Sequence, residues 1–319
     1  MKKSKTEELN ELFEEWIKNQ KKEKKLHKFF AKDGIICEEE YRKSGTRILF
    51  ILKEPNIMKD LIDENYDDDQ RIFYNDFFNN KFYDEINIEN GNRELKAIRN
   101  DTLIKRGILE VKENEKNYYY PFDNIPVKQK EKIARMAEYL INQNITDDYE
   151  TLKKALKQIA FMNLNKSGGD ATSDKNYFLD YCMNEDFFKN ICKEIKIINP
   201  EIIVFIGAKS YKNGDKYNFI NDEKKEINWL EVINNRKVID VVHTAARGRA
   251  LNINPEEKNI LKKTFNDKYN DNFDVMYKNI VKVDKSKLHM RQDKGVFKFF
   301  LKFVAAYKAS EEKNKEGNL

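Results

Sequence analysis

Residues 47–56, RILFILKEPN, decide the fold class that this sequence predicts. The stretch begins as a run of strand-forming residues, Arg47–Leu52, and ends in Lys-Glu-Pro-Asn. A continuous apolar run of this kind is typical of a strand that is buried on both faces of a parallel sheet. Because an unpaired carboxylate is costly to bury, Glu54 is either a functional group at the end of this strand or a solvated loop residue.

Three further segments also resemble buried strands. They are Ile159–Leu164, Glu201–Ile206 and Lys237–Val242. A helical stretch, Phe178–Ile197, precedes the Glu201 segment, and another segment beginning at Ala208 follows it. Alternating strands and helices predict right-handed crossovers in one sheet. We therefore expect an α/β fold, a three-layer α/β/α sandwich around a central four-stranded, mainly parallel sheet.

The remaining segments predict one elaborated domain over residues 1–319, without an internal repeat or a low-complexity linker. An N-terminal helix is expected within residues 1–33, from Thr6 through the lysine-rich run Lys18–Lys25. Residues 57–150 are too many for one crossover and predict an insertion, and residues 255–319 predict a helical extension with a frayed polar tail. Within these segments we expect a hairpin at Ile108–Tyr120 and helices at Glu131–Asn142 and Val296–Tyr307.

Composition narrows the classes of protein to consider. Of the 319 residues, 36% are charged, yet the formal net charge is only +5, which permits a nucleic-acid partner without requiring one. No apolar run approaches the length of a membrane span, so no membrane partner is expected. The 3 cysteines and 3 histidines lack metal-site spacing, which indicates a reduced cytoplasmic protein without disulfides, metal or cofactor.

Polar residues and a glycine stand at the ends of the four predicted strands. Glu54 follows the first strand, Asn163 and Lys166 end the second, Gly207 follows the third, and His243 follows the fourth. In sheets of this kind the ligand lies beyond the carboxyl ends of the strands. An acid, an amide, a lysine, a glycine and a histidine therefore converge on one edge, as in an active site.

The four segments, in this order and at this approximate spacing, resemble the motifs of the uracil-DNA glycosylase superfamily. The counterparts are FILKEPN at 50–56, FMNLNK at 161–166, NPEIIVFIGAKS at 199–210 and VVHTAARG at 241–248. Two places depart from the family pattern. Glu54 precedes the proline where relatives have Asp or Asn, and Thr244 follows His243 where relatives have Pro.

The resemblance implies a monofunctional DNA glycosylase. Such an enzyme flips a base out of the duplex and hydrolyses its N-glycosidic bond through an oxocarbenium-like transition state. Glu54 would stabilise the sugar cation or orient a water, His243 would donate to the departing base, and Asn163 would bind its pairing edge. The alternative for His243 is a hydrogen-bonded core histidine, and for Asn163 a residue that caps its own loop.

Contacts to the DNA backbone are expected from two loops. Lys166 and Ser167, which precede two adjacent glycines, would meet phosphate or the flipped base, and the alternatives are a surface lysine and a simple turn. By the resemblance, Arg247 and Arg249 would approach the minor groove and phosphates. The alternative is that both arginines serve only surface solubility.

The base itself would stack on an aromatic side chain of residues 71–84, as the resemblance implies. The candidates are Phe73, Tyr74 and Phe77, and the alternative for each is packing in a helical core.

Asn56 bears on the identity of the substrate. In the uracil-specific branch of the superfamily, a tyrosine after the proline of this motif blocks substituents at C5 of the pyrimidine. The smaller Asn56 implies room for a 5-substituted base, and the insertion at 57–150 would wall a larger pocket. By the resemblance, the expected substrate is a bulky 5-modified cytosine, such as glucosylated hydroxymethylcytosine, in double-stranded phage DNA. The enzyme is expected to be a monomer that acts in antiviral defence.

Three alternatives stay open at this point. A housekeeping uracil or mismatch glycosylase in base-excision repair would remove other bases. A non-catalytic nucleic-acid-binding module would tolerate Glu54→Gln and His243→Ala. An α/β enzyme acting on a nucleotide or sugar phosphate would use Ser167 with its glycines and Gly207, although the chain lacks the GxGxxG and P-loop spacings.

Overall fold

The computed structural model describes residues 3–23, 29–53, 67–69, 110–111, 118–119, 125–167, 181–182, 184–207, 212–213, 215–216, 236–241, 251–270, 272–281 and 294–316. The helices are α1 (Lys5–Gln20), α2 (Glu38–Lys43), α7 (Ile125–Asn142), α8 (Tyr149–Lys157), α10 (Glu185–Ile198), α12 (Pro255–Phe265), α13 (Phe273–Ile280) and α14 (Lys294–Glu316), with a 3-10 turn η2 (Asn266–Lys268). The strands are β1 (Phe30–Lys32), β2 (Gly34–Ile35), β3 (Ile48–Leu52), β4 (Asp67–Asp69), β5 (Glu110–Val111), β6 (Tyr118–Tyr119), β7 (Ala160–Asn163), β8 (Ile202–Ile206), β9 (Lys212–Asn213), β10 (Asp215–Lys216) and β11 (Lys237–Val241). No helix within these ranges is long and apolar enough to cross a membrane.

The central sheet has five strands in the order β11-β8-β3-β7-β2. The first four are parallel to one another, and β2 is an antiparallel edge strand. The prediction of an α/β fold on a mainly parallel sheet is confirmed, and all four predicted strands are present. The predicted number of strands is wrong, because Gly34 and Ile35 pair with Phe161 and Ala160 as a fifth strand. Two residues are too few to show a hydrophobic period in the sequence.

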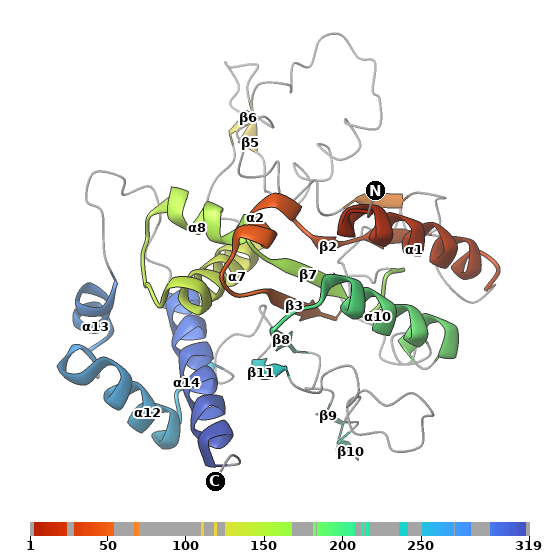
Figure 1. Cartoon of the computed structure of the whole chain (residues 1–319). Coiled ribbons are helices and arrows are strands. Elements are labelled where there is room, and N and C mark those ends of the chain that lie inside the picture. Colours follow the sequence, from red (N-terminus) through yellow and green to blue (C-terminus); the bar gives the residue numbers. More distant parts are fainter. Residues whose placement is uncertain are drawn as a thin grey trace.

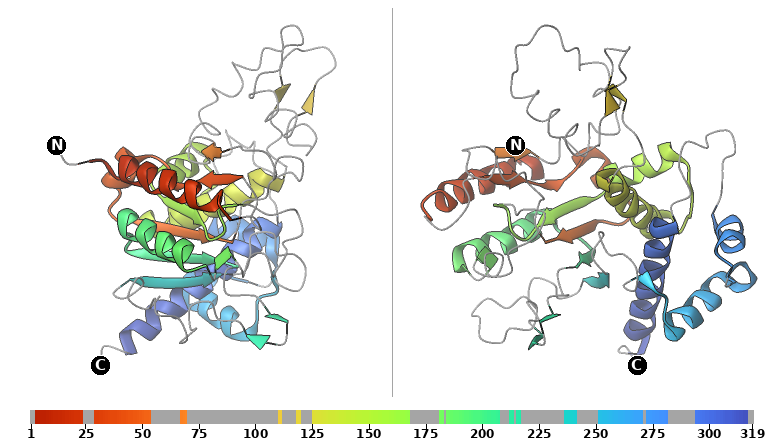
Figure 2. Two further views of the ribbon diagram at one scale, coloured as in Figure 1. Left: turned by 90° about the vertical axis from the view of Figure 1, so that its right-hand side faces the viewer. Right: turned by 180° about the vertical axis from the view of Figure 1, so that it is seen from behind.

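Both faces of the sheet are covered. Along β3, Ile48, Phe50 and Leu52 join one apolar cluster, whereas Leu49 and Ile51 join another. The first cluster includes residues of α7, α8, α12, α13 and α14, and the second includes residues of α1 and α10. Figures 1 and 2 show α1 and α10 across the sheet from α14. Burial on both sides explains why β3 has no alternating polar residue.

Helix α1 begins with a capping box and ends earlier than predicted. The backbone N–H of Glu7 donates to Oγ of Ser4 at 3.2 Å, and the backbone N–H of Ser4 donates to the Glu7 carboxylate at 2.8 Å. The helix ends at Gln20, so the predicted continuation through Lys18–Lys25 is wrong. Gln20 is buried and its side-chain amide donates to the carbonyl of Phe29 at 2.7 Å, which anchors the last turn next to the chain that leads into β1.

In its described parts, the extension after Pro255 is mainly helical, as predicted. The hairpin predicted within the insertion is present as the antiparallel pair β5–β6. The prediction of a frayed tail is wrong for the residues up to Glu316, because α14 continues to that residue. Partial burial would raise the pKa of Glu311, but hydrogen bonds from Lys308, Tyr307 and Lys237 lower it to about 2. The ionised carboxylate accepts from Lys237 of β11 at 3.1 Å and so ties α14 to the sheet.

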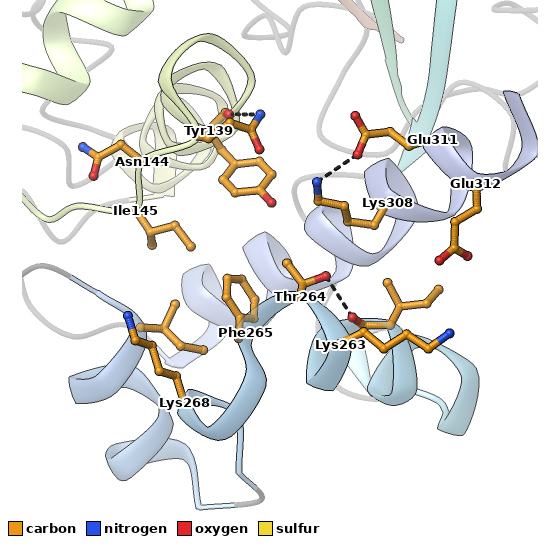
Figure 3. A pocket seen from close by; sticks show the side chains of 13 residues that line it. Tyr139, Asn144, Ile145, Lys263, Thr264, Phe265, Lys268, Lys308, Glu311 and Glu312 are labelled. Atoms are coloured by element: carbon orange, nitrogen blue, oxygen red, sulfur yellow. Dashed lines mark hydrogen bonds and ion pairs between the residues drawn. The ribbon is translucent and has the colours of Figure 1, made fainter. Parts of the chain in front are cut away.

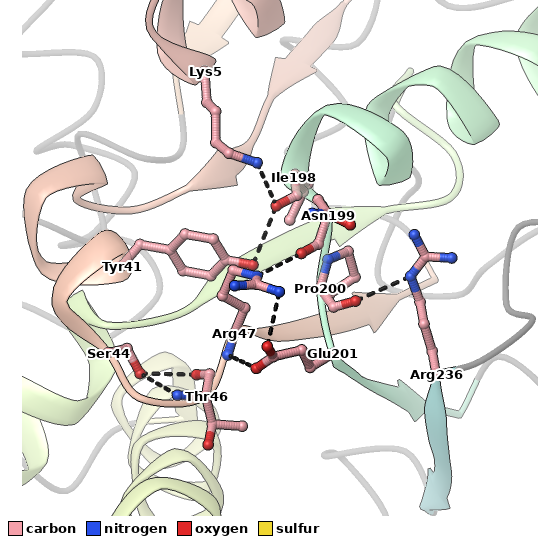
Figure 4. A network of polar contacts seen from close by, with 10 residues as sticks. All are labelled: Lys5, Tyr41, Ser44, Thr46, Arg47, Ile198, Asn199, Pro200, Glu201 and Arg236. Carbon is pink, nitrogen blue, oxygen red and sulfur yellow. Dashed lines mark hydrogen bonds and ion pairs between the residues drawn. The ribbon is translucent and has the colours of Figure 1, made fainter.

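A polar network closes the amino ends of the strands (Figure 4). Arg47, just before β3, forms an ion pair with Glu201, just before β8, at 2.8 Å, and its Nε donates to the carbonyl of Asn199 at 2.9 Å. Lys5 of α1 donates to the carbonyl of Ile198 at 2.9 Å. These contacts fix β3 against β8 at their amino ends, which leaves the opposite, carboxyl edge for a ligand.

Replacing Gly34 by alanine is expected to lower the free energy of unfolding by about 1–3 kcal/mol, because a residue with a side chain is strained at positive φ. Gly34 has φ 114°, and a Cβ there would lie 2.9 Å from Cδ1 of Leu9. Urea denaturation measures the loss. Gly45→Ala is the matched control, since a Cβ at Gly45 would meet no atom within 4 Å. Equal stability of the two variants would contradict the assigned backbone conformation.

Candidate functional site at the carboxyl edge of the sheet

The carboxyl ends of the four parallel strands meet at one edge. Leu52 of β3 is the register partner of Asn163 in β7, and the pairing continues past both strands because the backbone N–H of Asn165 donates to the carbonyl of Lys53 at 2.9 Å. On the other side, the backbone N–H of Gly207, after β8, donates to the carbonyl of Val241, the last residue of β11, at 2.9 Å. The loops that follow the four strands therefore start side by side.

Most of the predicted site residues lie outside the described ranges. These are Glu54, Asn56, Phe73, Tyr74, Phe77, His243, Arg247 and Arg249. The sequence places Glu54 directly after Lys53, and His243 follows Val241 with one residue between them. Their roles stay predictions, whereas Asn163, Lys166 and Ser167 are described in full.

Asn163 donates two hydrogen bonds to the buried carboxylate of Asp33. One oxygen of the Asp33 carboxylate accepts from the backbone N–H of Asn163 at 2.6 Å and from its side-chain Nδ2 at 3.1 Å. Both residues are almost completely buried, with 0% of Asp33 and 1% of Asn163 exposed. The last residue of β7 thus has its backbone and side chain fixed by one acid from the edge of the sheet.

Lys166 lies in the same buried cluster. Its ammonium contacts the other oxygen of Asp33 and lies 2.8 Å from a carboxyl oxygen of Glu194, a residue of α10. The rings of Phe13 and Trp16 lie 5.5 Å from the ammonium, each within range of a cation–π interaction. The ionisable side chains of Asp33, Lys166 and Glu194 are all 0% exposed. We name the set Asp33, Asn163, Lys166 and Glu194 the buried cluster.

The predicted contact of Lys166 and Ser167 with DNA does not agree with these positions. A phosphate outside the protein would reach the Lys166 ammonium only if the buried cluster opened. Ser167 is also fully buried, and its hydroxyl donates to the side-chain oxygen of Asn165 at 2.7 Å. The backbone N–H of Ser167 donates to the same oxygen at 3.0 Å, which makes a local turn. In the described structure both residues support the loop after β7 from within.

The surroundings of Glu194 raise its pKa. Burial disfavours its charged form and raises its pKa well above the ordinary 4.5, and the neighbouring Asp33 carboxyl acts in the same direction, whereas Lys166 opposes them. Asp33 accepts three hydrogen bonds, from the Asn163 backbone, the Asn163 side chain and Lys166. The surroundings of Glu194 therefore favour its protonated form, whereas Asp33 is the acid that accepts from Asn163.

Replacing Glu194 by glutamine is expected to stabilise the protein increasingly as pH rises. Below about pH 4.5 the carboxyl is protonated in folded and unfolded chains alike. Above that pH the unfolded chain loses the proton first, so the wild type loses up to about 1.4 kcal/mol per pH unit until the raised pKa is passed. Urea denaturation from about pH 4 to about pH 8 measures this difference. A difference in the free energy of unfolding that does not change with pH would contradict a raised pKa of Glu194. Glu256→Gln, at an exposed position, controls for the loss of an ordinary carboxylate.

The sequence reading missed Asp33 and Glu194. Asp33 precedes Gly34, and an Asp-Gly pair indicates a turn more often than a buried charge. A signal did exist for Glu194, because it falls between Ile191, Ile195 and Ile198 on the apolar face of an amphipathic helix. An acid on a buried helix face requires a partner, and the only way to find Lys166 as that partner is through the fold.

A hollow of about 580 Å³ lies away from this edge, between α7, α12, η2, α13 and α14 (Figure 3). Its wall contains Tyr139, Phe265 and Lys308, and the Lys308 ammonium is hydrogen-bonded to Glu311 at 2.8 Å. The side chain of Lys263 extends away from the centre of the hollow in Figure 3. No residue predicted for the site lines it, so the carboxyl edge of the sheet remains the candidate site.

Comparison with known proteins gives no assignment. No protein-family model, curated protein or solved structure matches the chain. Among the residues that the structure describes, no group of three histidines, cysteines or acids is arranged to hold a metal ion. The chemistry of the candidate site is therefore argued from its own residues.

Proposed function

We propose that this protein is a monofunctional DNA glycosylase that removes a pyrimidine base by hydrolysis. The observation that carries the proposal is the pairing of β3 with β7, in which Leu52 lies opposite Asn163 and Lys53 pairs with Asn165. Lys53, the residue before Glu54 in the sequence, therefore lies beside the end of the strand that carries the amide predicted to bind the base. An acid and an amide that follow neighbouring parallel strands suit cleavage of a bond next to a recognised base.

The strand order supports a ligand at this place. Along the chain, β3 is followed by β7 on one side of it and then by β8 on the other. In open α/β sheets, the crevice outside the carboxyl ends at such a change of direction is the usual ligand site. A three-layer α/β/α sandwich like that of the uracil-DNA glycosylases, with helical extensions, is the fold that we propose for the whole domain.

The proposed reaction joins a water oxygen to C1′ of the sugar as the bond from C1′ to the base nitrogen breaks. The base leaves with the bonding electrons and is neutralised by a proton. Glu54 orients the water and stabilises the positive charge that develops on the sugar, and His243 donates a hydrogen bond to the base as it becomes negative. Asn163, which is 1% exposed in the described structure, would bind the pairing edge of the flipped base once the groups that cover its amide move aside.

The remaining sequence features support the proposal of DNA contacts around this site. Arg247 and Arg249 follow His243 and would bind phosphates, and one of Phe73, Tyr74 and Phe77 would stack on the base. Asn56 leaves more room at C5 than a tyrosine would. We therefore propose a bulky 5-modified cytosine in phage DNA as the substrate, which makes antiviral defence the proposed role.

A panel of DNA substrates tests the proposal. Purified protein is incubated with glucosylated phage DNA, unmodified DNA and uracil-containing DNA, and alkali then cleaves the strands at abasic sites. We expect abasic sites only in the glucosylated DNA. Abasic sites only in uracil-DNA would support the proposed reaction but show that uracil, and not the modified cytosine, is the substrate. Binding to all three DNAs without any abasic site would overturn the glycosylase and favour a binding module.

A further inference from the structure

We propose that Asp33 is a positioning residue that fixes which way the side-chain amide of Asn163 faces. The consequence for base selection rests on the function proposed above, whereas the amide orientation itself does not. Asp33 lies between β1 and β2, and β2 pairs with β7 through Gly34 and Phe161. The edge strand therefore brings the Asp33 carboxylate against the end of β7.

The orientation follows from the chemistry of the two groups. A carboxylate can only accept hydrogen bonds, whereas the end of an asparagine side chain has an accepting oxygen and a donating nitrogen. With Nδ2 of Asn163 donating to Asp33 at 3.1 Å, a half-turn of the amide would place Oδ1 against the carboxylate instead. The backbone N–H of Asn163 donates to the same oxygen at 2.6 Å, so the residue cannot move away as a unit without losing that bond too.

The ion pair with Lys166 offsets the cost of burying the Asp33 carboxylate. Its ammonium contacts the oxygen of Asp33 that does not face Asn163, and a carboxyl oxygen of Glu194 lies 2.8 Å from the same ammonium. The backbone of Lys166 is also fixed, because its carbonyl accepts from the N–H of Ala31 in β1 at 2.8 Å. Asp33 thus contacts β7 through Asn163 and the loop after β7 through Lys166, and β1 fixes the backbone of Lys166.

An asparagine amide that is held in one orientation distinguishes between bases by the order of the hydrogen-bond donors and acceptors on their edges. Cytosine presents an amino donor at position 4 and an acceptor at N3, whereas uracil and thymine present an acceptor at position 4 and a donor at N3. An asparagine whose amide can turn over would serve both kinds of base. Asn163 held by Asp33 favours one kind, so Asp33 sets the specificity of the site through Asn163.

Asp33→Asn tests this arrangement, and Glu194→Gln is the matched control. An asparagine at position 33 cannot satisfy both neighbours, because its oxygen can face either Asn163 or Lys166 while its nitrogen meets a donor on the other side. Asparagine has nearly the same shape as aspartate and fills the same space, so the variant is expected to fold. Glu194→Gln alters the same cluster but leaves both hydrogen bonds from Asn163 to Asp33 in place.

Two readouts separate the inference from the proposed function. The first is the ratio of kcat/KM for the favoured and the disfavoured kind of base, cytosine-type or uracil-type, which we expect to fall at least about tenfold in Asp33→Asn and to stay unchanged in Glu194→Gln. The second needs no substrate: NMR-detected hydrogen exchange of the Asn163 backbone N–H and Nδ2 protons. We expect both to exchange more slowly than the side chain of exposed Asn259 in the wild type, and at least about tenfold faster in Asp33→Asn.

Different results would overturn the proposed function, the positioning role of Asp33 and its link to specificity. If the wild type releases no base from any DNA, the proposed function fails while the exchange measurement still decides the role of Asp33. If the Nδ2 protons of wild-type Asn163 exchange as fast as those of Asn259, the positioning role is overturned, even when Asp33→Asn cannot be obtained as a folded protein. An unchanged kcat/KM ratio in a folded, active Asp33→Asn variant overturns the link to specificity.

Discussion

Replacing Glu54 by glutamine is expected to slow base release by about 10²–10⁴-fold while DNA binding is retained. Glutamine has nearly the same shape as glutamate but lacks the negative charge that stabilises an oxocarbenium-like sugar, and it is too weak a base to take a proton from water. Single-turnover measurement of abasic sites gives the rate, and titration of labelled DNA under the same salt gives the affinity.

The control for this variant is Glu256→Gln, which removes an exposed acid from the first turn of α12. Its rate of base release and its DNA affinity should both equal those of the wild type. Full activity in Glu54→Gln would remove Glu54 from the chemistry. A parallel loss of DNA binding would show instead that the residue acts in forming the complex.

Replacing Lys166 by methionine is expected to lower the free energy of unfolding by about 3–5 kcal/mol, the usual result of removing one partner from a buried ion pair. The ammonium lies between Asp33 and Glu194, and all three side chains are 0% exposed. Without Lys166 the Asp33 charge has no counter-ion in the cluster, although methionine fills a similar volume. Urea denaturation near neutral pH measures the loss.

Two further variants make this result specific. Lys43→Met removes an exposed lysine that pairs with Glu39 at 2.5 Å, and we expect no measurable change in stability. Adding Asp33→Asn to Lys166→Met is expected to recover part of the lost stability, because the unpaired charge is then absent. A loss no larger than that of Lys43→Met, or a double variant as unstable as the sum of the two single variants, would contradict the ionic account of the buried cluster.

The fold class could be predicted because the strands of a parallel sheet leave a strong local signal. Ile48–Leu52 and Ile202–Ile206 are uninterrupted apolar runs, and helices on both faces are the physical reason for that pattern. The edge strand β2 could not be predicted in this way. It has two residues, and it exists because the antiparallel pairing with β7 completes the edge of the sheet.

The candidate site was predictable only in outline. Chain order and strand ends placed Asn163 at the carboxyl edge of the sheet, and the pairing of Leu52 with Asn163 agrees with that placement. The partners of Lys166 could not be read from the sequence, because Asp33 and Glu194 are distant along the chain. A lysine near a glycine-rich loop suggests a phosphate contact, whereas a lysine between two buried acids stabilises the interior.

The central claim, hydrolysis of a glycosidic bond in DNA, is tested most directly by identifying what leaves the DNA. Wild-type protein and Glu54→Gln are incubated with glucosylated phage DNA, and the small molecules released are identified by mass spectrometry while abasic sites are counted in the same sample. We predict an intact modified cytosine base, released one for one with abasic sites by the wild type and almost absent with Glu54→Gln. Release of nucleosides or nucleotides, or of no small molecule from this DNA and from uracil-DNA, would contradict the claim.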